Sequence, residues 1–145
     1  MSSIKKVLIG FALLLLSINF FGFTSDTKLP DPVIASALRG KDVYKAQCLA
    51  CHQQDGGGVP HLNPPLDGSQ NVNGNDKARL IKIVLNGLAD RVEIEGEMYS
   101  NTMASHKDLS NQQIADVLTY IRNSWTNKAG PVTVEEVKIG RSKLK

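Results

Sequence analysis

The five residues Cys48-Leu49-Ala50-Cys51-His52 constrain this chain more than any other part of its sequence. They form a C-x-x-C-H sequence, which is typical of sites where a c-type haem is attached covalently. Side chains three positions apart lie on the same side of a helical turn, so Cys48 and Cys51 can each form a thioether bond to a haem vinyl group. His52 follows at once and places its imidazole beneath the iron. We therefore predict one covalent haem c, held by Cys48 and Cys51, with His52 as an axial iron ligand.

Three other uses of the two cysteines fit the sequence less well. A thioredoxin-like redox C-x-x-C is expected in a βαβ context, and no strand pattern precedes Cys48. A zinc site needs four ligands, but the chain has no further cysteine and only two other histidines, His61 and His106. A simple disulfide would not need the histidine that follows Cys51.

The N-terminus has the pattern of a secretory signal. Lys5 and Lys6 precede an apolar stretch at residues 7–23, and a basic segment before an apolar one directs export. We expect residues 1–24 to be a signal peptide, with residues 7–23 retained as a membrane anchor as the alternative. The stretch is near the lower limit of about 17 residues for a spanning helix, and Asn19 interrupts it, which favours cleavage.

The charge of the chain excludes one class of partner. The full sequence has 17 basic and 14 acidic residues. Without Lys5 and Lys6, the exported part carries 15 basic residues against 14 acidic ones and contains no run rich in lysine or arginine. We therefore expect no nucleic-acid binding.

The first predicted helix carries the two cysteines. We expect residues 25–35 to be a linker, because they contain Pro30 and Pro32 and establish no apolar period. A helix over residues 36–51 follows, with its apolar residues at helical spacing and Gly40 on the same stripe. A glycine inside a helix usually has a packing reason, so we expect another helix to cross closely at Gly40.

The middle of the chain alternates between loop and helix. Residues 53–75 are rich in glycine and proline and predict a long loop. Such a loop is uncommon in a compact domain, unless it wraps a large rigid cofactor. A second helix is expected over residues 76–86, with Gly87 ending it, and residues 89–107 are again irregular.

The last main helix has the clearest start signal. Ser110 and Gln113 have the spacing of a capping box. The apolar face of the helix continues through Ile114, Val117, Leu118, Ile121 and Trp125. A Gly-Pro pair at 130–131 ends it. We expect residues 129–145 to be a polar, peripheral tail with a short helical turn over residues 134–139.

With these features together, the chain resembles a class I cytochrome c over residues 36–128. The resemblance is carried by the first helix, a Pro-Pro loop, the middle helix and the closing helix, at residues 40–52, 58–69, 84–88 and 114–125. The closing helix is very similar to that of bacterial cytochromes that serve periplasmic dehydrogenases and reductases. The resemblance implies an all-α class I cytochrome c fold, with three main helices and long loops wrapped around one covalently bound haem. It also implies that Gly40 meets Tyr120 where the first and last helices cross.

The resemblance further implies a methionine sulfur as the second axial ligand. Beyond the initiator, the chain offers only Met98 and Met103. Met103 stands at the family's distance from Tyr99 and from the following helix cap, so it is the expected ligand. Ala104 is a departure, because the family usually has proline there. Met98, His106 and an open iron position remain as alternatives.

The resemblance also assigns haem contacts. A metal-ligating histidine usually donates its second ring N–H to a carbonyl, and here the expected acceptor is the carbonyl of Pro64. The side chains expected to contact the haem are Val59, Leu66, Leu85 and Leu88. Ordinary core packing predicts the same burial for these four residues.

These predictions favour an electron-transfer protein and not an enzyme. With both axial positions filled, the iron cannot bind a substrate and cycles between Fe(III) and Fe(II). We expect the redox partner to be a periplasmic dehydrogenase or reductase or a terminal oxidase. The expected location is the periplasm, with membrane attachment only if residues 7–23 are retained. The alternative is a haem enzyme or gas-binding sensor whose sixth coordination position is open.

Overall fold

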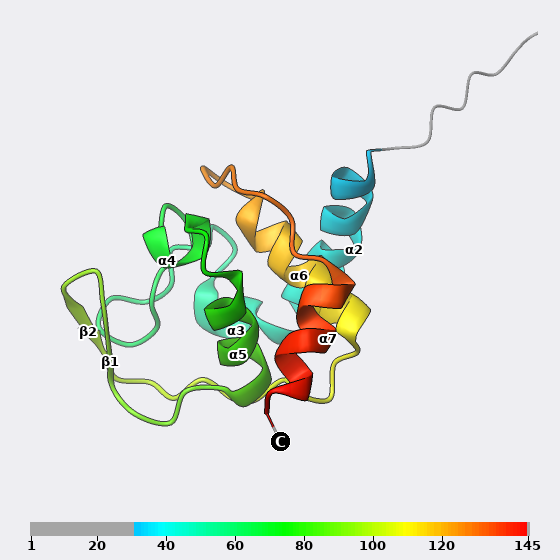
Figure 1. Ribbon diagram of the computed structural model, residues 1–145. Helices are drawn as coiled ribbons and strands as arrows, with labels where there is room; N and C mark the ends of the chain where they lie inside the picture. Colours follow the sequence, from blue (N-terminus) through cyan, green and yellow to red (C-terminus); the bar gives the residue numbers. More distant parts are fainter. Residues whose placement is uncertain (1–30, 145) are drawn as a thin grey trace, which may run out of the picture.

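The computed structural model describes residues 31–144, which contain six helices and one two-stranded sheet (Figure 1). This mostly helical architecture confirms the predicted all-α fold class. No helix in this part of the chain combines the length and apolar character that crossing a membrane requires. The predicted signal peptide at residues 1–24, the alternative anchor at residues 7–23 and most of the predicted linker at residues 25–35 lie outside the described residues.

The first helix, α2 (Pro32–Gln47), begins four residues earlier than predicted. The Asp31 carboxylate caps its start by accepting a hydrogen bond from the backbone N–H of Val33 at 2.7 Å. Pro32 suits the first helical position, where no backbone N–H is needed. The predicted linker is therefore helical from residue 32 onward. The short helix α3 (Leu49–His52) follows and carries most of the C-x-x-C-H sequence.

The last main helix is α6 (Asn111–Arg122), and its predicted capping box is confirmed. Ser110 Oγ accepts a hydrogen bond from the Gln113 backbone N–H at 3.1 Å, and Gln113 Oε1 accepts one from the Ser110 N–H at 2.9 Å. The helix ends before Trp125, contrary to the prediction. Trp125 has a φ of 55°, which turns its indole onto the surface of Gly56.

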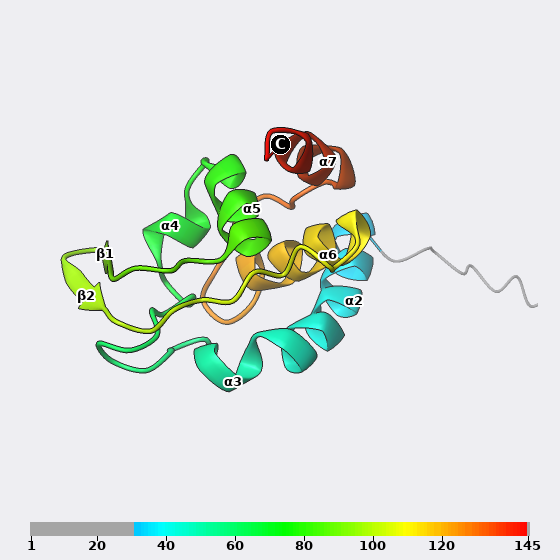
Figure 2. The same ribbon diagram turned by 90° about the horizontal axis from the view of Figure 1, so that it is seen from below.

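Helices α2 and α6 cross each other (Figures 1 and 2), and the point of closest approach is at Gly40. A Cβ atom at this residue would lie 2.0 Å from the backbone oxygen of Asp116 and 2.8 Å from Cβ of Tyr120. Only glycine fits this approach, and the predicted contact between Gly40 and Tyr120 is confirmed. The buried Asp116 carboxylate also joins the helices, because it accepts hydrogen bonds from Ser36 Oγ at 2.6 Å and Arg39 Nε at 2.7 Å.

Helix α5 (Lys77–Asn86) agrees with the predicted second helix to within one residue. The Asp76 carboxylate accepts a hydrogen bond from the Arg79 backbone N–H at 2.9 Å, which caps the start of the helix. Gly87, with a φ of 71°, ends it as expected. The predicted loop before α5 contains one helical turn, α4 (Gln70–Asn73), which was not predicted.

Between α5 and α6 lies a β-hairpin that the sequence did not predict. Strand β1 (Val92–Ile94) pairs antiparallel with β2 (Glu97–Tyr99) across a two-residue turn that begins at Glu95. Each strand has three residues, too few for an alternating pattern to stand out. The Glu95 carboxylate accepts hydrogen bonds from Ser69 Oγ and from the backbone N–H of Gln70, both at 2.7 Å. These bonds tie the hairpin to the start of α4.

The C-terminal residues form helix α7 (Val134–Ser142), which contains the helical turn predicted over residues 134–139 and continues three residues beyond it. The prediction that residues 129–145 are a peripheral tail is wrong, because part of this helix is buried. Thr133 and Glu136 form a capping box at its start. Val137 is fully buried in a core that α7 shares with α5 and α6. This helix therefore completes the hydrophobic core and covers the outer face of α5 (Figure 2).

Candidate functional site

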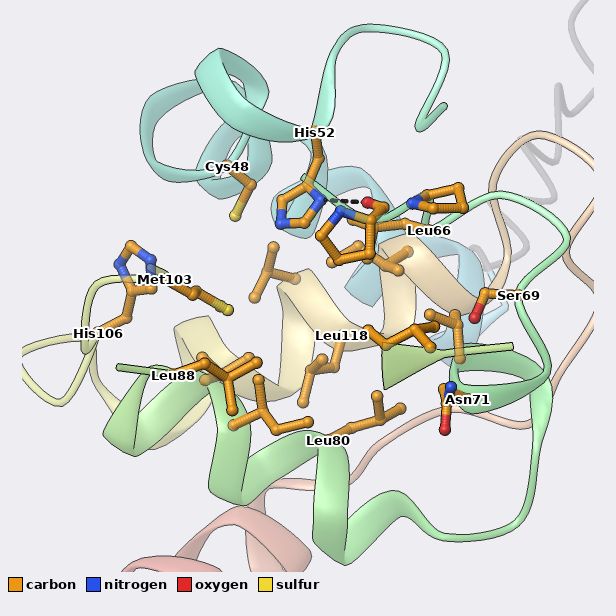
Figure 3. A pocket seen from close by; sticks show the side chains of 18 of the residues that line it. Cys48, His52, Leu66, Ser69, Asn71, Leu80, Leu88, Met103, His106 and Leu118 are labelled. Carbon is orange, nitrogen blue, oxygen red and sulfur yellow. Dashed lines mark hydrogen bonds between the residues drawn. The ribbon is translucent and has the colours of Figure 1, made fainter. Parts of the chain in front are cut away.

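An apolar cavity lies between α3, α5, α6 and the loop that carries Met103 (Figure 3). Its lining includes Leu80, Ile83 and Val84 from α5 and Val117, Leu118 and Ile121 from α6. An adjoining hollow is lined by Cys51 and shares Cys48, His52 and Met103 with this cavity. The space is thus apolar, and the sulfur and nitrogen atoms that the sequence analysis singled out lie at its walls.

His52, the last residue of α3, is buried and its ring orientation is fixed. Its Nδ1 donates a hydrogen bond to the carbonyl oxygen of Pro64 at 3.0 Å, which is the predicted contact. Figure 3 shows the opposite edge of the ring facing the cavity. Burial lowers the pKa of His52, and the hydrogen bond to Pro64 only partly offsets this effect. The imidazole is therefore neutral near pH 7, with the lone pair of Nε2 directed at the cavity, as a metal ligand requires.

The two cysteines lie on the same side of the cavity as His52. Cys48 is half-buried and its sulfur points into the cavity (Figure 3), whereas Cys51 is exposed and lines the outer hollow. Burial, together with the nearby Cys51, raises the pKa of Cys48 to about 11. A redox-active C-x-x-C has a cysteine with a lowered pKa, so the environment of Cys48 does not favour a thioredoxin-like site.

Met103 lies in the loop between β2 and α6, and its backbone is fixed against the end of α5. Its N–H donates to the carbonyl of Leu88 at 2.8 Å, and the Leu88 N–H donates to the carbonyl of Met103 at 2.9 Å. Gly87 permits this contact, because a Cβ there would lie 2.2 Å from the Met103 oxygen. The Met103 sulfur points into the cavity, across from His52 (Figure 3).

Met98 and the histidines other than His52 are placed less favourably than Met103. Met98 lies on β2, is 48% exposed and does not line the cavity. His61 is exposed and lies beside Glu97, with 3.7 Å between its Nδ1 and the carboxylate. His106 does line the cavity, at its rim beside Met103 (Figure 3). Of the two alternative ligands predicted from the sequence, His106 is therefore placed closer to the cavity than Met98.

The residues predicted to contact a haem divide into two groups. Pro64, Leu66 and Leu88 line the cavity. Contrary to the prediction, Val59 and Leu85 do not. Leu85 lies on the face of α5 that packs against α6 and α7, and Val59 pairs with Asn63 in a tight turn.

Sequence analysis missed other lining residues on α5. Leu80, Ile83 and Val84 line the cavity, whereas Ile81 and Leu85 belong to the core cluster beneath α7. A signal was present, because α5 is apolar on more than one face, which indicates a helix packed on both sides.

The donor set of this cavity fits a haem. No group of three or more His, Cys, Asp or Glu side chains suited to a metal ion occurs within residues 31–144. The cavity instead offers the oriented imidazole of His52 and the thioether sulfur of Met103, with a second histidine, His106, at its rim. The pair of His52 and Met103 suits an iron whose other four ligands come from a porphyrin. The apolar walls match the faces of such a macrocycle, and the two thiols at one edge match its covalent attachment.

A family model described as cytochrome c matches residues 37–125, which is more than half of the chain. The chain belongs to the cytochrome c family. Its cofactor is accordingly a covalent haem c, and its function is electron transfer. The predicted class I cytochrome c fold is confirmed.

The relatives of this cytochrome include both small cytochromes and subunits of larger enzymes. It is 38% identical over 112 residues to cytochrome c-552 of Thermus thermophilus, covering 72% of this chain and 85% of that protein. It is 38% identical over 111 residues to the cytochrome c subunit of the quinone alcohol dehydrogenase of Gluconacetobacter polyoxogenes, and 37% identical over 101 residues to the gluconate 2-dehydrogenase cytochrome c subunit of Pantoea cypripedii. The chain spans only 22% and 23% of the length of these two subunits.

Proposed function

We propose that Cys48 and Cys51 hold the haem through thioether bonds, and that His52 and Met103 are its two axial ligands. The protein passes single electrons to or from a separate oxidoreductase and catalyses no reaction of its own. The observation that carries this proposal is the arrangement of His52 and Met103. The His52 ring is oriented by Pro64 at 3.0 Å, and the Met103 sulfur points into the cavity from the other side (Figure 3).

The haem supplies an iron that cycles between Fe(III) and Fe(II). The protein sets the balance between these two states. Met103 supplies a thioether sulfur, which favours the ferrous state. The aliphatic walls from α5 and α6 exclude water and disfavour the additional positive charge of the ferric state. Pro64 keeps the His52 ring in one orientation, so that little rearrangement accompanies electron transfer.

The hollow beside Cys51 is where a haem attached to Cys48 and Cys51 would be nearest to a redox partner. Cys51 is exposed and lines this hollow together with Gln47, Asn101 and Thr102. A small contact surface around this hollow would suit a short-lived complex with a redox partner. The partner is a periplasmic dehydrogenase or reductase or a terminal oxidase. The relatives named as dehydrogenase subunits support the first of these, and the basic and apolar N-terminal sequence supports export.

The proposed ligation is tested on the full-length protein matured with haem. The intact protein is expected to gain the mass of one haem, and Cys48→Ala with Cys51→Ala abolishes that gain. Met103→Ala is expected to lower the reduction potential and to let the ferrous protein bind carbon monoxide. Met98→Ala is the matched control and leaves both properties unchanged. Rapid carbon monoxide binding by the unaltered ferrous protein would contradict ligation by Met103 and favour the open-site alternative.

A further inference from the structure

Arg141 on helix α7 makes three hydrogen bonds to one short segment of the chain. Its Nη1 donates to the carbonyl oxygen of Lys107 at 2.7 Å, and its Nη2 donates to that of Leu109 at 2.7 Å. Its Nε donates to Oδ1 of Asn111 at 2.8 Å. A guanidinium is planar and presents its donors in a fixed fork, so these three bonds hold residues 107–111 in one geometry.

Residues 104–110 connect Met103 to helix α6. The first part of this connection is tied to the end of α5, because Ser105 Oγ donates to the Leu85 carbonyl at 2.6 Å and the His106 N–H donates to the Val84 carbonyl at 2.9 Å. The second part, from residue 107 onward, is tied to α7 by Arg141. The loop that carries Met103 is therefore held from two helices.

Helix α7 is itself firmly placed, so Arg141 acts from a fixed position. Val137 is fully buried in the core beneath α7. Gly140, beside Arg141, lets α7 lie close to α5, because a Cβ there would lie 2.6 Å from Ile81 Cγ2. This packing does not depend on the guanidinium, so removing Arg141 should free the loop while α7 stays in place.

We propose that Arg141 is a positioning residue for the sixth iron ligand: it restrains residues 107–111 and thereby keeps the Met103 sulfur directed at the iron. This inference rests on the proposed ligation by Met103. Helix α7 lies beyond residues 37–125, the part of the chain that matches the family model. The C-terminal helix thus contributes to the haem site although it supplies none of its lining.

The test compares two Arg141 variants of the full-length haem-containing protein with one control variant. Arg141→Met removes the charge and the fork, and Arg141→Lys keeps the charge but cannot reproduce the three bonds. Lys138→Met is the matched control, because it removes a cation from the same helix at an exposed side chain whose one ion pair, at 3.7 Å, is to Glu135. The readouts are the carbon monoxide binding rate of the ferrous protein, the methionine-to-iron absorption band of the ferric protein and hydrogen exchange of residues 104–109.

Both Arg141 variants are expected to bind carbon monoxide at least about tenfold faster, since the net loss of a single hydrogen bond already shifts an opening equilibrium by roughly that factor. The absorption band should weaken, and hydrogen exchange should accelerate at residues 104–109 but not in α7. Lys138→Met should match the parent. If Arg141→Met fails to mature with haem, the same three readouts are taken on Arg141→Lys and on Asn111→Ala, which removes one of the three acceptors of Arg141. The same changes are expected in these variants.

Two results would overturn the inference. One is an Arg141→Met protein that binds carbon monoxide at the rate of Lys138→Met. The other is faster hydrogen exchange throughout the chain, with carbon monoxide binding rising only in proportion to the loss of global stability. Met103→Ala separates this failure from failure of the proposed ligation. If Met103→Ala abolishes the band while the Arg141 variants do not change it, only the role of Arg141 is refuted.

Discussion

Gly40→Ala tests the contact between the first and last main helices, α2 and α6. Two effects of this substitution predict opposite signs for the change in the free energy of unfolding. Helix propensity favours alanine over glycine by about 1 kcal/mol in a helix interior, so propensity alone predicts a more stable protein. Packing predicts the reverse. The new Cβ would lie 2.0 Å from the Asp116 backbone oxygen and 2.8 Å from Tyr120 Cβ, and a backbone oxygen cannot turn away as a side chain can.

The packing effect should win. Overpacking a close contact typically costs about 1–3 kcal/mol, and a clash with backbone lies at the upper end of that range because the whole helix must shift. The shift would also stretch the hydrogen bonds that Ser36 and Arg39 donate to Asp116. We therefore expect Gly40→Ala to lose about 2 kcal/mol of unfolding free energy after the gain in propensity.

The assay is urea denaturation of the haem-containing protein, followed by far-ultraviolet circular dichroism. Gly140→Ala provides the comparison, because it brings the same gain in propensity but meets the Ile81 side chain, with its Cγ2 at 2.6 Å. It should therefore lose less stability than Gly40→Ala. A Gly40→Ala protein as stable as the parent, or more stable, would refute the argument that this crossing requires glycine.

Further predictions concern the core and the charged joint between α2 and α6. Val137→Ala should lower the unfolding free energy by about 2 kcal/mol, measured by thermal denaturation, because Val137 is fully buried; an unchanged melting temperature would contradict a structural role for α7. Asp116→Asn should destabilise the protein at neutral pH. Burial alone would raise the pKa of the Asp116 carboxyl, but hydrogen bonds from Arg39 and other donors outweigh it and hold the pKa below its ordinary value. The carboxylate therefore stabilises the fold fully above about pH 3.9 and less as the pH falls below it. The difference in unfolding free energy between the parent and Asp116→Asn should accordingly shrink in acid. A difference in unfolding free energy that does not change with pH would contradict this.

The parts of the fold that the sequence predicted well are those with local signals. The capping box of Ser110 and Gln113 fixed the start of α6, and Gly87 fixed the end of α5. The contact of Gly40 with Tyr120 came from the family resemblance, and the stripe position of Gly40 indicated only that some helix crosses there.

The parts that were missed depend on contacts distant in sequence or on very short elements. Trp125 continues the apolar spacing of α6 but leaves the helix to cover Gly56, a residue 69 positions earlier in the chain. The hairpin has strands of three residues, below the length at which a pattern is recognisable. Helix α7 was predicted only as a short turn over residues 134–139. The capping box of Thr133 and Glu136 was a local signal for its start, but its few apolar residues did not indicate that it packs into the core.

The same division holds for the site. The C-x-x-C-H sequence identified Cys48, Cys51 and His52 directly, because adjacent residues carry the chemistry. The lining was harder to predict, because α5 is apolar on two faces and periodicity alone does not say which of them meets the cavity. The family resemblance assigned Leu85 to the cavity, but Leu85 belongs to the core cluster that includes Val137 of α7, and Val84 lines the cavity.

The packing of Val137 shows that the hydrophobic core of this chain extends beyond the residues that match the family model. The family match ends at residue 125, but the hydrophobic interior continues to α7, where Val137 covers Ile81 and Leu85. A shortened chain that stops at the family boundary would leave these aliphatic side chains facing water. Such a fragment should be prone to aggregation even though every proposed haem-binding residue is still present.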